Sequence, residues 1–182
     1  STREEWLAQA GEDQELSKVL GHLHGLFRDA DTLGSLITPR SAELEGALFG
    51  ADMGIGAGWA QVRLALGEVL KRERHDTTVL GSTATDVVVA AELLAQRYTI
   101  VATNPPYLQR NAMDISLARY IDQTYPDAKS DIATAFIERC LALVVAGGTV
   151  AVVSPQNWLL LGSYEKFRRK LLRGHQFDAV AR

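Results

Sequence analysis

The chain has 182 residues, of which 47% are hydrophobic, so it is long enough to form one ordinary domain with a buried core. Its formal net charge is −3, whereas proteins that bind nucleic acid through charge alone are usually basic, so a nucleic-acid role requires a local patch or further parts of a longer protein. The single cysteine excludes an internal disulfide and a multi-cysteine zinc site, and no apolar run suits a membrane span or a signal peptide; we expect a cytoplasmic location.

Residues 1–97 have a mostly helical pattern. An apolar stripe at helical spacing is formed by Leu16, Val19, Leu20, Leu23 and Phe27. Gly34 and Pro39 break this pattern within 30–40. Further helices are predicted at 41–49, at 59–74 and at 86–96, the last with Thr85 as its N-cap.

Residues 98–182 change character and predict alternating strands and helices. The expected strands are 98–103, 149–154 and 176–181. Between them we predict a helix over 131–145 and another from 163 to 172. This order favours a parallel sheet with right-handed crossovers, hence an α/β fold preceded by a helical segment.

Cap residues mark the limits of these two helices. Ser130 is the predicted N-cap of the first, with Asp131 in its first turn, and Gly147-Gly148 is expected to end it. Ser163 is the predicted cap of the second, and Gly174 follows its end. Cys140 lies in the apolar pattern of the first helix, which indicates a buried, inert thiol.

The stretch Asn104-Pro105-Pro106-Tyr107 ends the first strand abruptly. Proline has a fixed φ and no N–H, so the carbonyl of Pro105 can be held outward as a free acceptor beside the side-chain carbonyl of Asn104. The carboxyl end of a strand is also where ligands bind in open α/β sheets. A simple strand-ending turn is the alternative interpretation.

Two fixed acceptors suit an NH2 group, which has two hydrogens to donate. Accepting both from an exocyclic purine amine draws its nitrogen toward tetrahedral geometry and frees its lone pair for attack. Tyr107 adds an aromatic face on which a base swung out of a duplex could stack.

At these residues the sequence resembles class I S-adenosylmethionine-dependent amino-methyltransferases. "TNPPYLQRNAMD", followed by "KSDIATAFIER" and "GGTVAVVSPQNWL", is similar to the core of large DNA adenine-N6 methyltransferases, in particular the PglX type of BREX phage defence and type IIG restriction–modification enzymes. The resemblance covers 98–173 and extends to 20–40. It implies a partial Rossmann-like methyltransferase fold, double-stranded DNA as partner and possible further defence-system subunits.

The resemblance also implies roles for individual residues. Asn104 and Pro105 would hold the adenine N6 amine, Tyr107 would stack on the base, and Pro106 would line the pocket near the cofactor. Asp131 would lie below the site near the cofactor, or act only as a first-turn helix acid. A target-base pocket would be bordered by Ser154, Gln156 and Trp158, although Trp158 could equally be a core aromatic.

Basic residues offer candidate contacts to DNA phosphate. Arg110 follows the motif, and a basic helix surface is formed by Lys166, Arg168, Arg169, Lys170 and Arg173. Such a surface is more often only solvated. His22 and His24 are two residues apart and so do not share a helix face, which argues against a metal site.

The glycine spacing of "ADMGIGAGW" (51–59) is similar to that of a glycine-rich cofactor loop. A helical pattern rather than a strand precedes it, and about 40 residues separate it from Tyr98, too few for the strands that the fold inserts there. We therefore expect a plain loop at 51–59, the main S-adenosylmethionine loop before Ser1, and a catalytic fragment inactive by itself.

The Asn-Pro-Pro-Tyr motif is also compatible with other functions. A glutamine-N5 or an RNA guanine-N2 methyltransferase would present the same kind of NH2 group. A DNA-binding subunit that keeps the motif without turnover is an alternative of a different class.

Overall fold

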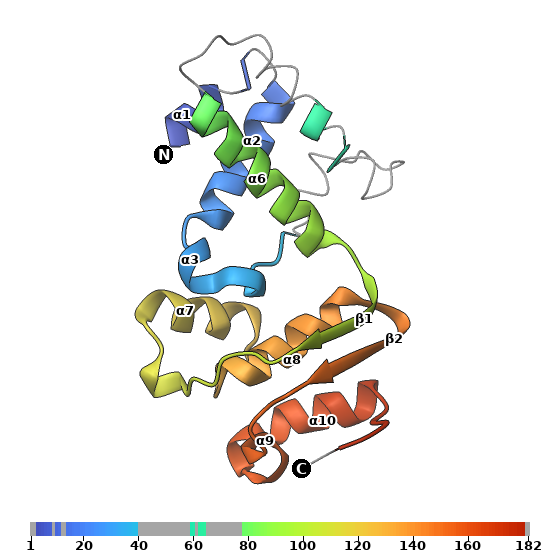
Figure 1. The fold of residues 1–182 in the computed structure, drawn as a ribbon. Coiled ribbons are helices and arrows are strands. Elements are labelled where there is room, and N and C mark those ends of the chain that lie inside the picture. The colour runs from blue at the N-terminus through green and yellow to red at the C-terminus, as the bar shows by residue number, and fades with distance from the viewer. Residues whose placement is uncertain are drawn as a thin grey trace. The chain divides into compact units, whose positions relative to one another are not determined.

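The computed structural model describes residues 3–8, 10–11, 14–39, 59–60, 62–64 and 78–180. The chain divides into two compact units, Ser1–Gln96 and Arg97–Arg182. Figure 1 shows helices throughout the described part of the first unit, and a small sheet with its helices in the second.

The longer helices in the described part of the first unit are α1 (Arg3–Ala8), α2 (Gln14–Phe27) and α6 (Thr78–Ala95). The apolar stripe predicted for α2 is buried, except that Phe27 is only partly covered. Its core combines residues from these helices with Ala10 and with two residues from 59–64. The buried members are Trp6, Ala10, Leu16, Val19, Leu20, Leu23, Trp59, Val62, Val88, Ala91 and Ala95. The helical spacing thus predicted the packing face of α2 correctly.

Several details of this unit differ from the sequence prediction or lie outside it. The helix predicted at 86–96 begins at Thr78, so Thr85 lies inside α6 and does not cap it. Residues 30–40 contain a short helix, α3 (Ala30–Leu33), and the 3-10 turn η1 (Gly34–Leu36), where Gly34 has φ +51°. The predicted helix at 41–49 and most of that at 59–74 fall outside the described residues. Of the loop predicted at 51–59, only Trp59 is described, and it is helical.

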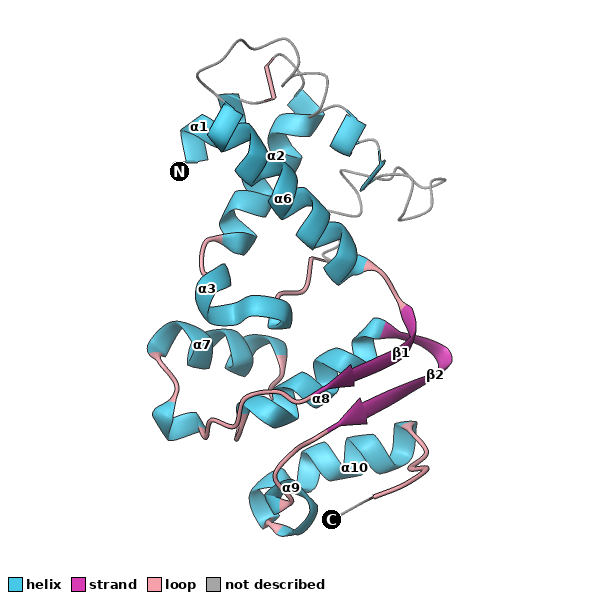
Figure 2. Cartoon of the chain, viewed as in Figure 1, coloured by secondary structure: helices cyan, strands magenta, loops and turns pink. Residues whose placement is uncertain are grey.

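In the second unit, the described residues form a two-stranded parallel sheet from β1 (Tyr98–Thr103) and β2 (Val144–Val152). Figure 2 shows the strands side by side and running in the same direction. The limits of β1 and its parallel pairing match the prediction. The strands are not fully buried, however, since Ile100 is 70% exposed. A parallel sheet is normally covered on both faces, and here helix α8 (Ile132–Leu143) packs against the two strands.

The predicted end of the helix at 131–145 is wrong. Helix α8 ends at Leu143, and the glycine pair expected to stop it lies inside β2. The strand begins early because Val144 already pairs with Tyr98; the register then shifts before Thr149 pairs with Ile100. Gly147 has φ +78°, and a Cβ on Gly148 would lie 2.9 Å from the carbonyl oxygen of Thr99. The glycines therefore permit an irregular, close approach of the two strands.

Two predicted caps are also wrong. Asp131 rather than Ser130 is the N-cap of α8, because its carboxylate accepts a hydrogen bond from the Ala133 amide at 2.8 Å. Helix α10 (Glu165–Gly174) follows the 3-10 turn η3 (Gly162–Tyr164), so Ser163 lies in that turn and does not cap it.

The third predicted strand, at 176–181, is not found. Residues 175–180 have no regular secondary structure, and 181 lies outside the described part. The apolar run "FDAVA" is long enough for a strand, but a strand needs a neighbour with which to pair. Phe177 instead stacks on Trp158, with ring centroids 6.4 Å apart.

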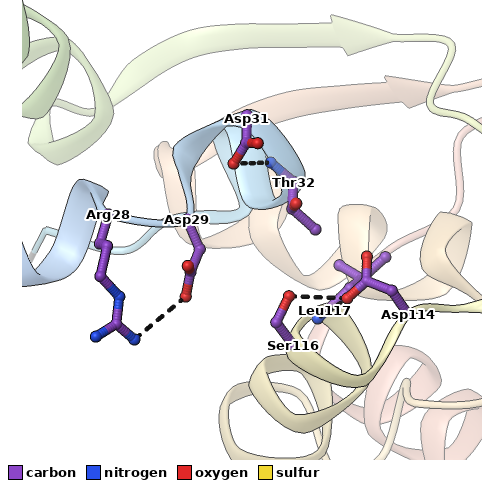
Figure 3. Close-up of polar contacts among 7 residues, drawn as sticks. All are labelled: Arg28, Asp29, Asp31, Thr32, Asp114, Ser116 and Leu117. Carbon is purple, nitrogen blue, oxygen red and sulfur yellow. Dashed lines mark hydrogen bonds and ion pairs between the residues drawn. The ribbon is translucent and has the colours of Figure 1, made fainter.

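Helix α7 (Ile115–Thr124) was not predicted. Asp114 caps it by accepting hydrogen bonds from the Leu117 amide at 2.9 Å and from the Ser116 hydroxyl at 2.8 Å (Figure 3). These two bonds, that of the backbone amide first, lower the pKa of Asp114. Leu117 and Ile121 are buried and lie on the same face of the helix.

Candidate active site

The Asn-Pro-Pro-Tyr corner begins where the sheet stops. The last bond between the strands joins the Val153 amide to the Thr103 carbonyl at 3.1 Å, and Asn104 is the next residue. Pro105 is buried and anchors the corner, whereas Asn104, Pro106 and Tyr107 are exposed. The Tyr107 hydroxyl donates to Asn104 Oδ1 at 3.0 Å, and the Tyr107 side chain is 52% exposed.

The acceptors of this corner differ in availability. No hydrogen bond to the Pro105 carbonyl occurs within the part of the chain that the structure describes. Asn104 Oδ1 has one partner, the Tyr107 hydroxyl, and a carbonyl oxygen has two lone pairs, so it can accept a second hydrogen bond. The corner can thus receive an NH2 group from solvent.

The segment after the corner is tied to the start of α8. The Ile132 amide donates to the Leu108 carbonyl at 2.9 Å, and the Arg110 amide donates to the Ser130 carbonyl at 3.1 Å. Gln109 and Asp131 form an isolated antiparallel bridge. These bonds hold the motif loop in place and lower the entropy lost when it binds a substrate.

We call these backbone hydrogen bonds between 108–110 and 130–132 the clamp to α8. Asp131 lies within it and is 7% exposed. Burial raises the pKa of its carboxyl group, while the backbone amides of Ala133 and Leu108 act in the opposite direction. Its carboxylate therefore joins the helix start to the motif loop. The sequence placed Asp131 near the cofactor, and that contact stays a prediction.

The segment after β2 contains the residues predicted to border the base. Ser154 and Gln156 lead into helix α9 (Asn157–Leu160), and the Trp158 indole N–H donates to Ser154 Oγ at 2.9 Å. Trp158 is 9% exposed and meets Phe167 edge-to-face, with ring centroids 5.6 Å apart. The structure thus places Trp158 in the packing between α9 and α10, while Gln156 is exposed.

A pocket of about 620 Å³ lies directly beyond the motif. Its walls come from the turn after the motif, from α7, from the residues before α8 and from the α9–η3 segment. The lining residues are Gln109, Arg110, Asn111, Asp122, Lys129, Ser130, Asn157, Leu161, Ser163 and Tyr164. Burial, and then the charge of Asp131, raises the pKa of Tyr164.

Most of the predicted phosphate-binding side chains have partners within the protein. Arg110 forms a two-point ion pair with Asp122, at 2.5 and 3.3 Å. Arg168 donates to the carbonyls of Trp158 at 2.7 Å and Leu161 at 2.5 Å. Arg169 pairs with Glu165 at 2.6 Å, one helical turn away.

Lys170 continues this pattern by pairing with Glu138 at 2.8 Å. Lys166 and Arg173 are exposed on α10. The basic helix surface is therefore occupied in large part by internal contacts, and its predicted binding to phosphate stays a prediction.

Among the lining residues that the sequence did not single out are Asp122, Lys129 and Tyr164. Asp122 and Tyr164 reach the pocket from elements distant in the chain, and only the fold brings them to Arg110 and Ser130. Lys129 offered a local signal, since it directly precedes the predicted cap of α8.

The described residues contain neither a membrane-spanning helix nor a cluster of metal ligands. No described helix is long and apolar enough to cross a membrane. Among the described residues, no group of three or more His, Cys, Asp or Glu side chains could hold a metal ion. His24 packs edge-to-face on Trp6 instead, at 5.4 Å between ring centroids. Cys140 is buried, and burial raises the pKa of its thiol, as expected for an inert side chain.

Comparison with known proteins extends these observations. Residues 70–181 match the family described as Eco57I restriction-modification methylase. The chain is 32% identical over 176 residues to "Adenine-specific methyltransferase BrxX" of Escherichia coli O9:H4 (strain HS), a match that covers 96% of this chain and 13% of that protein. It is 31% identical over 86 residues to "Adenine-specific methyltransferase PglX" of Lacticaseibacillus casei (strain Zhang), which covers 47% of this chain and 7% of that protein.

The chain therefore spans only a small part of the length of these relatives. The matched range includes the Asn-Pro-Pro-Tyr corner, the clamp to α8 and the α9–η3 segment. On the strength of a match over more than half of its length, the chain belongs to the Eco57I restriction-modification methylase family.

Proposed function

We propose that the chain is part of the catalytic domain of a site-specific DNA methyltransferase that transfers a methyl group to adenine N6, in phage defence or restriction–modification. The observation that carries this proposal is the rigid corner at the end of β1, which presents two acceptors and an exposed aromatic ring to solvent. Family membership and the names of the two relatives support the same chemistry.

The corner would act by positioning and polarising the amine. Asn104 Oδ1 and the Pro105 carbonyl accept one N6 hydrogen each, which raises electron density on nitrogen and directs its lone pair away from the protein. The base stacks on Tyr107, whose hydroxyl is already fixed by Asn104. The methylated nitrogen becomes acidic and loses its proton to water, so no strongly shifted general base is needed.

The methyl donor in this family is S-adenosylmethionine, which supplies an electrophilic methyl group when bound. Exposed Pro106 fits the predicted apolar wall beside it. Asp131 fits less well, because its buried carboxylate already accepts from the Ala133 amide. Within the described residues, no glycine-rich turn joins a strand to a helix. We propose that other parts of the full-length protein supply the main donor-binding loop.

Double-stranded DNA is the proposed substrate, and the cytoplasm is the proposed compartment because the DNA of the bacterial relatives lies there. The names of the relatives favour adenine over the amide of glutamine or the amine of guanine in RNA. Further defence-system subunits are proposed as partners by the same resemblance.

A methyl-transfer assay with competing acceptors tests this proposal. Full-length protein is incubated with methyl-labelled S-adenosylmethionine and, separately, with unmethylated plasmid DNA, ribosomal RNA and a peptide-release factor. We expect label in DNA alone. Label in RNA or in the release factor would favour the rival enzymes, and DNA binding without any transfer would favour the non-catalytic subunit.

A further inference from the structure

The pocket beyond the motif lies one step along the chain from the proposed target site. Gln109, the first lining residue, is two residues after Tyr107, so their Cα atoms are at most about 7 Å apart. Nucleotides on one strand of a duplex rise about 3.4 Å each. The pocket is therefore close enough to the corner to meet the backbone of a DNA strand whose adenine occupies that corner.

The charges that line the pocket favour an anion. Arg110 and Asp122 neutralise one another through their two-point ion pair. Lys129 is exposed, and within the described part of the chain it has no acidic partner. Asp131, whose charge reaches Tyr164 in the pocket wall, is buried and held by the Ala133 amide, so Lys129 is the lining cation left without an ion-pair partner among the described residues. The side-chain amides of Asn111 and Asn157 add neutral hydrogen-bond donors.

Both walls of the pocket are fixed before any ligand binds. The turn on one side is held by the bond from the Arg110 amide to the Ser130 carbonyl at 3.1 Å. On the other side, the Arg168 guanidinium binds the carbonyls of Trp158 and Leu161, which fixes the chain between α9 and η3. A pre-formed pocket loses little entropy on binding, so it suits a ligand whose chemistry is the same at every DNA sequence, such as a backbone phosphate.

We propose that this pocket holds the phosphodiester next to the target adenine on the same DNA strand, with Lys129 contacting the phosphate oxygens. This inference rests on the proposed function and adds a residue to it. Lys129 would fix the position of the strand, while the corner of Asn104 and Pro105 acts on the base. Arg168, predicted to touch phosphate itself, would instead hold the pocket wall.

The test uses the full-length protein and a probe that needs no recognition sequence. A fluorescein-labelled, single-stranded, random-sequence 20-mer is titrated by anisotropy between 50 and 200 mM salt. The logarithm of the association constant falls linearly with the logarithm of the salt concentration, and losing one phosphate contact should make this slope less steep by about 0.7. Lys129→Ala should also weaken binding about fivefold, the equivalent of an exposed ion pair of about 1 kcal/mol.

Two variants make the result specific. Arg119→Ala removes the same charge from an exposed position on α7 outside the pocket, and it should leave affinity and slope unchanged. Lys129→Arg keeps the charge and should retain most of the affinity. An unchanged affinity and slope in Lys129→Ala, or an equal loss in Arg119→Ala, would overturn the proposal.

Methyl transfer to plasmid DNA separates this inference from the proposed function. Lys129→Ala should raise the KM for DNA about fivefold and leave kcat within twofold, because the contact positions the strand and does not touch the reacting nitrogen. An increase in the KM for S-adenosylmethionine instead would make the pocket a donor site and refute the inference. A wild-type protein that transfers no methyl group, yet binds the 20-mer through Lys129, would refute the proposed function and leave the phosphate contact intact.

Discussion

The motif corner and the basic helix α10 were both candidates for contact with DNA, and the structure treats them in opposite ways. Asn104, Pro106 and Tyr107 remain exposed at the end of β1, on a backbone held by buried Pro105. On α10, Arg168 and Arg169 bind groups of the protein itself. The corner is free to bind a ligand because its prolines remove N–H groups locally. A charged side chain of α10 is free to bind DNA only if the fold brings no acceptor near it.

The strongest way to break this comparison is to remove the acceptor of the corner. Asn104→Ala in the full-length protein should lower kcat for DNA methylation about 10²–10³-fold, the usual loss for one preorganised polar contact to a reacting group. DNA affinity should be unchanged. Gln123→Ala, at an exposed position on α7, is the matched control. Turnover of Asn104→Ala within threefold of wild type would show that the corner is only a strand-ending turn.

The next prediction concerns Arg168, the side chain of α10 that joins it to the α9 segment. Arg168→Ala removes two charge-assisted hydrogen bonds to backbone carbonyls and should lower the free energy of unfolding by about 2 kcal/mol. Urea unfolding of the 182-residue chain measures this change. Arg173→Ala, exposed on the same helix, should stay within about 0.5 kcal/mol. Equal stability of the two variants would mean that Arg168 is available to DNA.

Asp131 gives a smaller effect with a pH signature. Asp131→Ala removes the α8 cap and should lower the free energy of unfolding by about 1 kcal/mol, while Asp131→Asn keeps a capping oxygen and should lose less.

Because burial raises the pKa of Asp131 in the folded state, the native state holds its proton to higher pH than the unfolded chain does. Its contribution to stability should therefore fall as pH rises from the ordinary value of 3.8 through the raised folded pKa. Asp131→Asn lacks this titration, so its stability relative to wild type should increase over that range in urea unfolding at stepped pH. A constant difference would contradict the raised pKa.

The smallest expected effect is at Arg169. Its pair with Glu165 is exposed and spans one helical turn, so Arg169→Ala should change the free energy of unfolding by about 0.4 kcal/mol or less. Thermal unfolding at 50 mM and 500 mM salt measures this pair, because screening should reduce even that difference. A salt-insensitive loss above 1 kcal/mol would place Arg169 among the structural arginines with Arg168.

Sequence predicted best what depends on neighbouring residues. The limits of β1 follow from a β-branched run ended by two prolines, and the buried face of α2 follows from its spacing. The exposed corner follows from the same two prolines. These features need no knowledge of distant partners.

Predictions failed where tertiary contacts override a local rule. Gly147-Gly148 looked like a helix stop, but Val144 pairs with Tyr98 and turns the chain into a strand earlier. The strand predicted at 176–181 lacks a partner strand in the described structure, and Phe177 packs on Trp158 instead. The pocket could not be predicted because its walls come from separate elements.

The central claim is that the corner at the end of β1 prepares adenine N6 for methylation. Nucleoside mass spectrometry of DNA from a methylation-deficient bacterial host that expresses the full-length protein tests it most directly. We predict that N6-methyldeoxyadenosine accumulates with the wild-type protein and falls far below that level with Asn104→Ala at equal expression. N6-methyldeoxyadenosine at the same level in both strains, or N4-methyldeoxycytidine in its place, would contradict the claim.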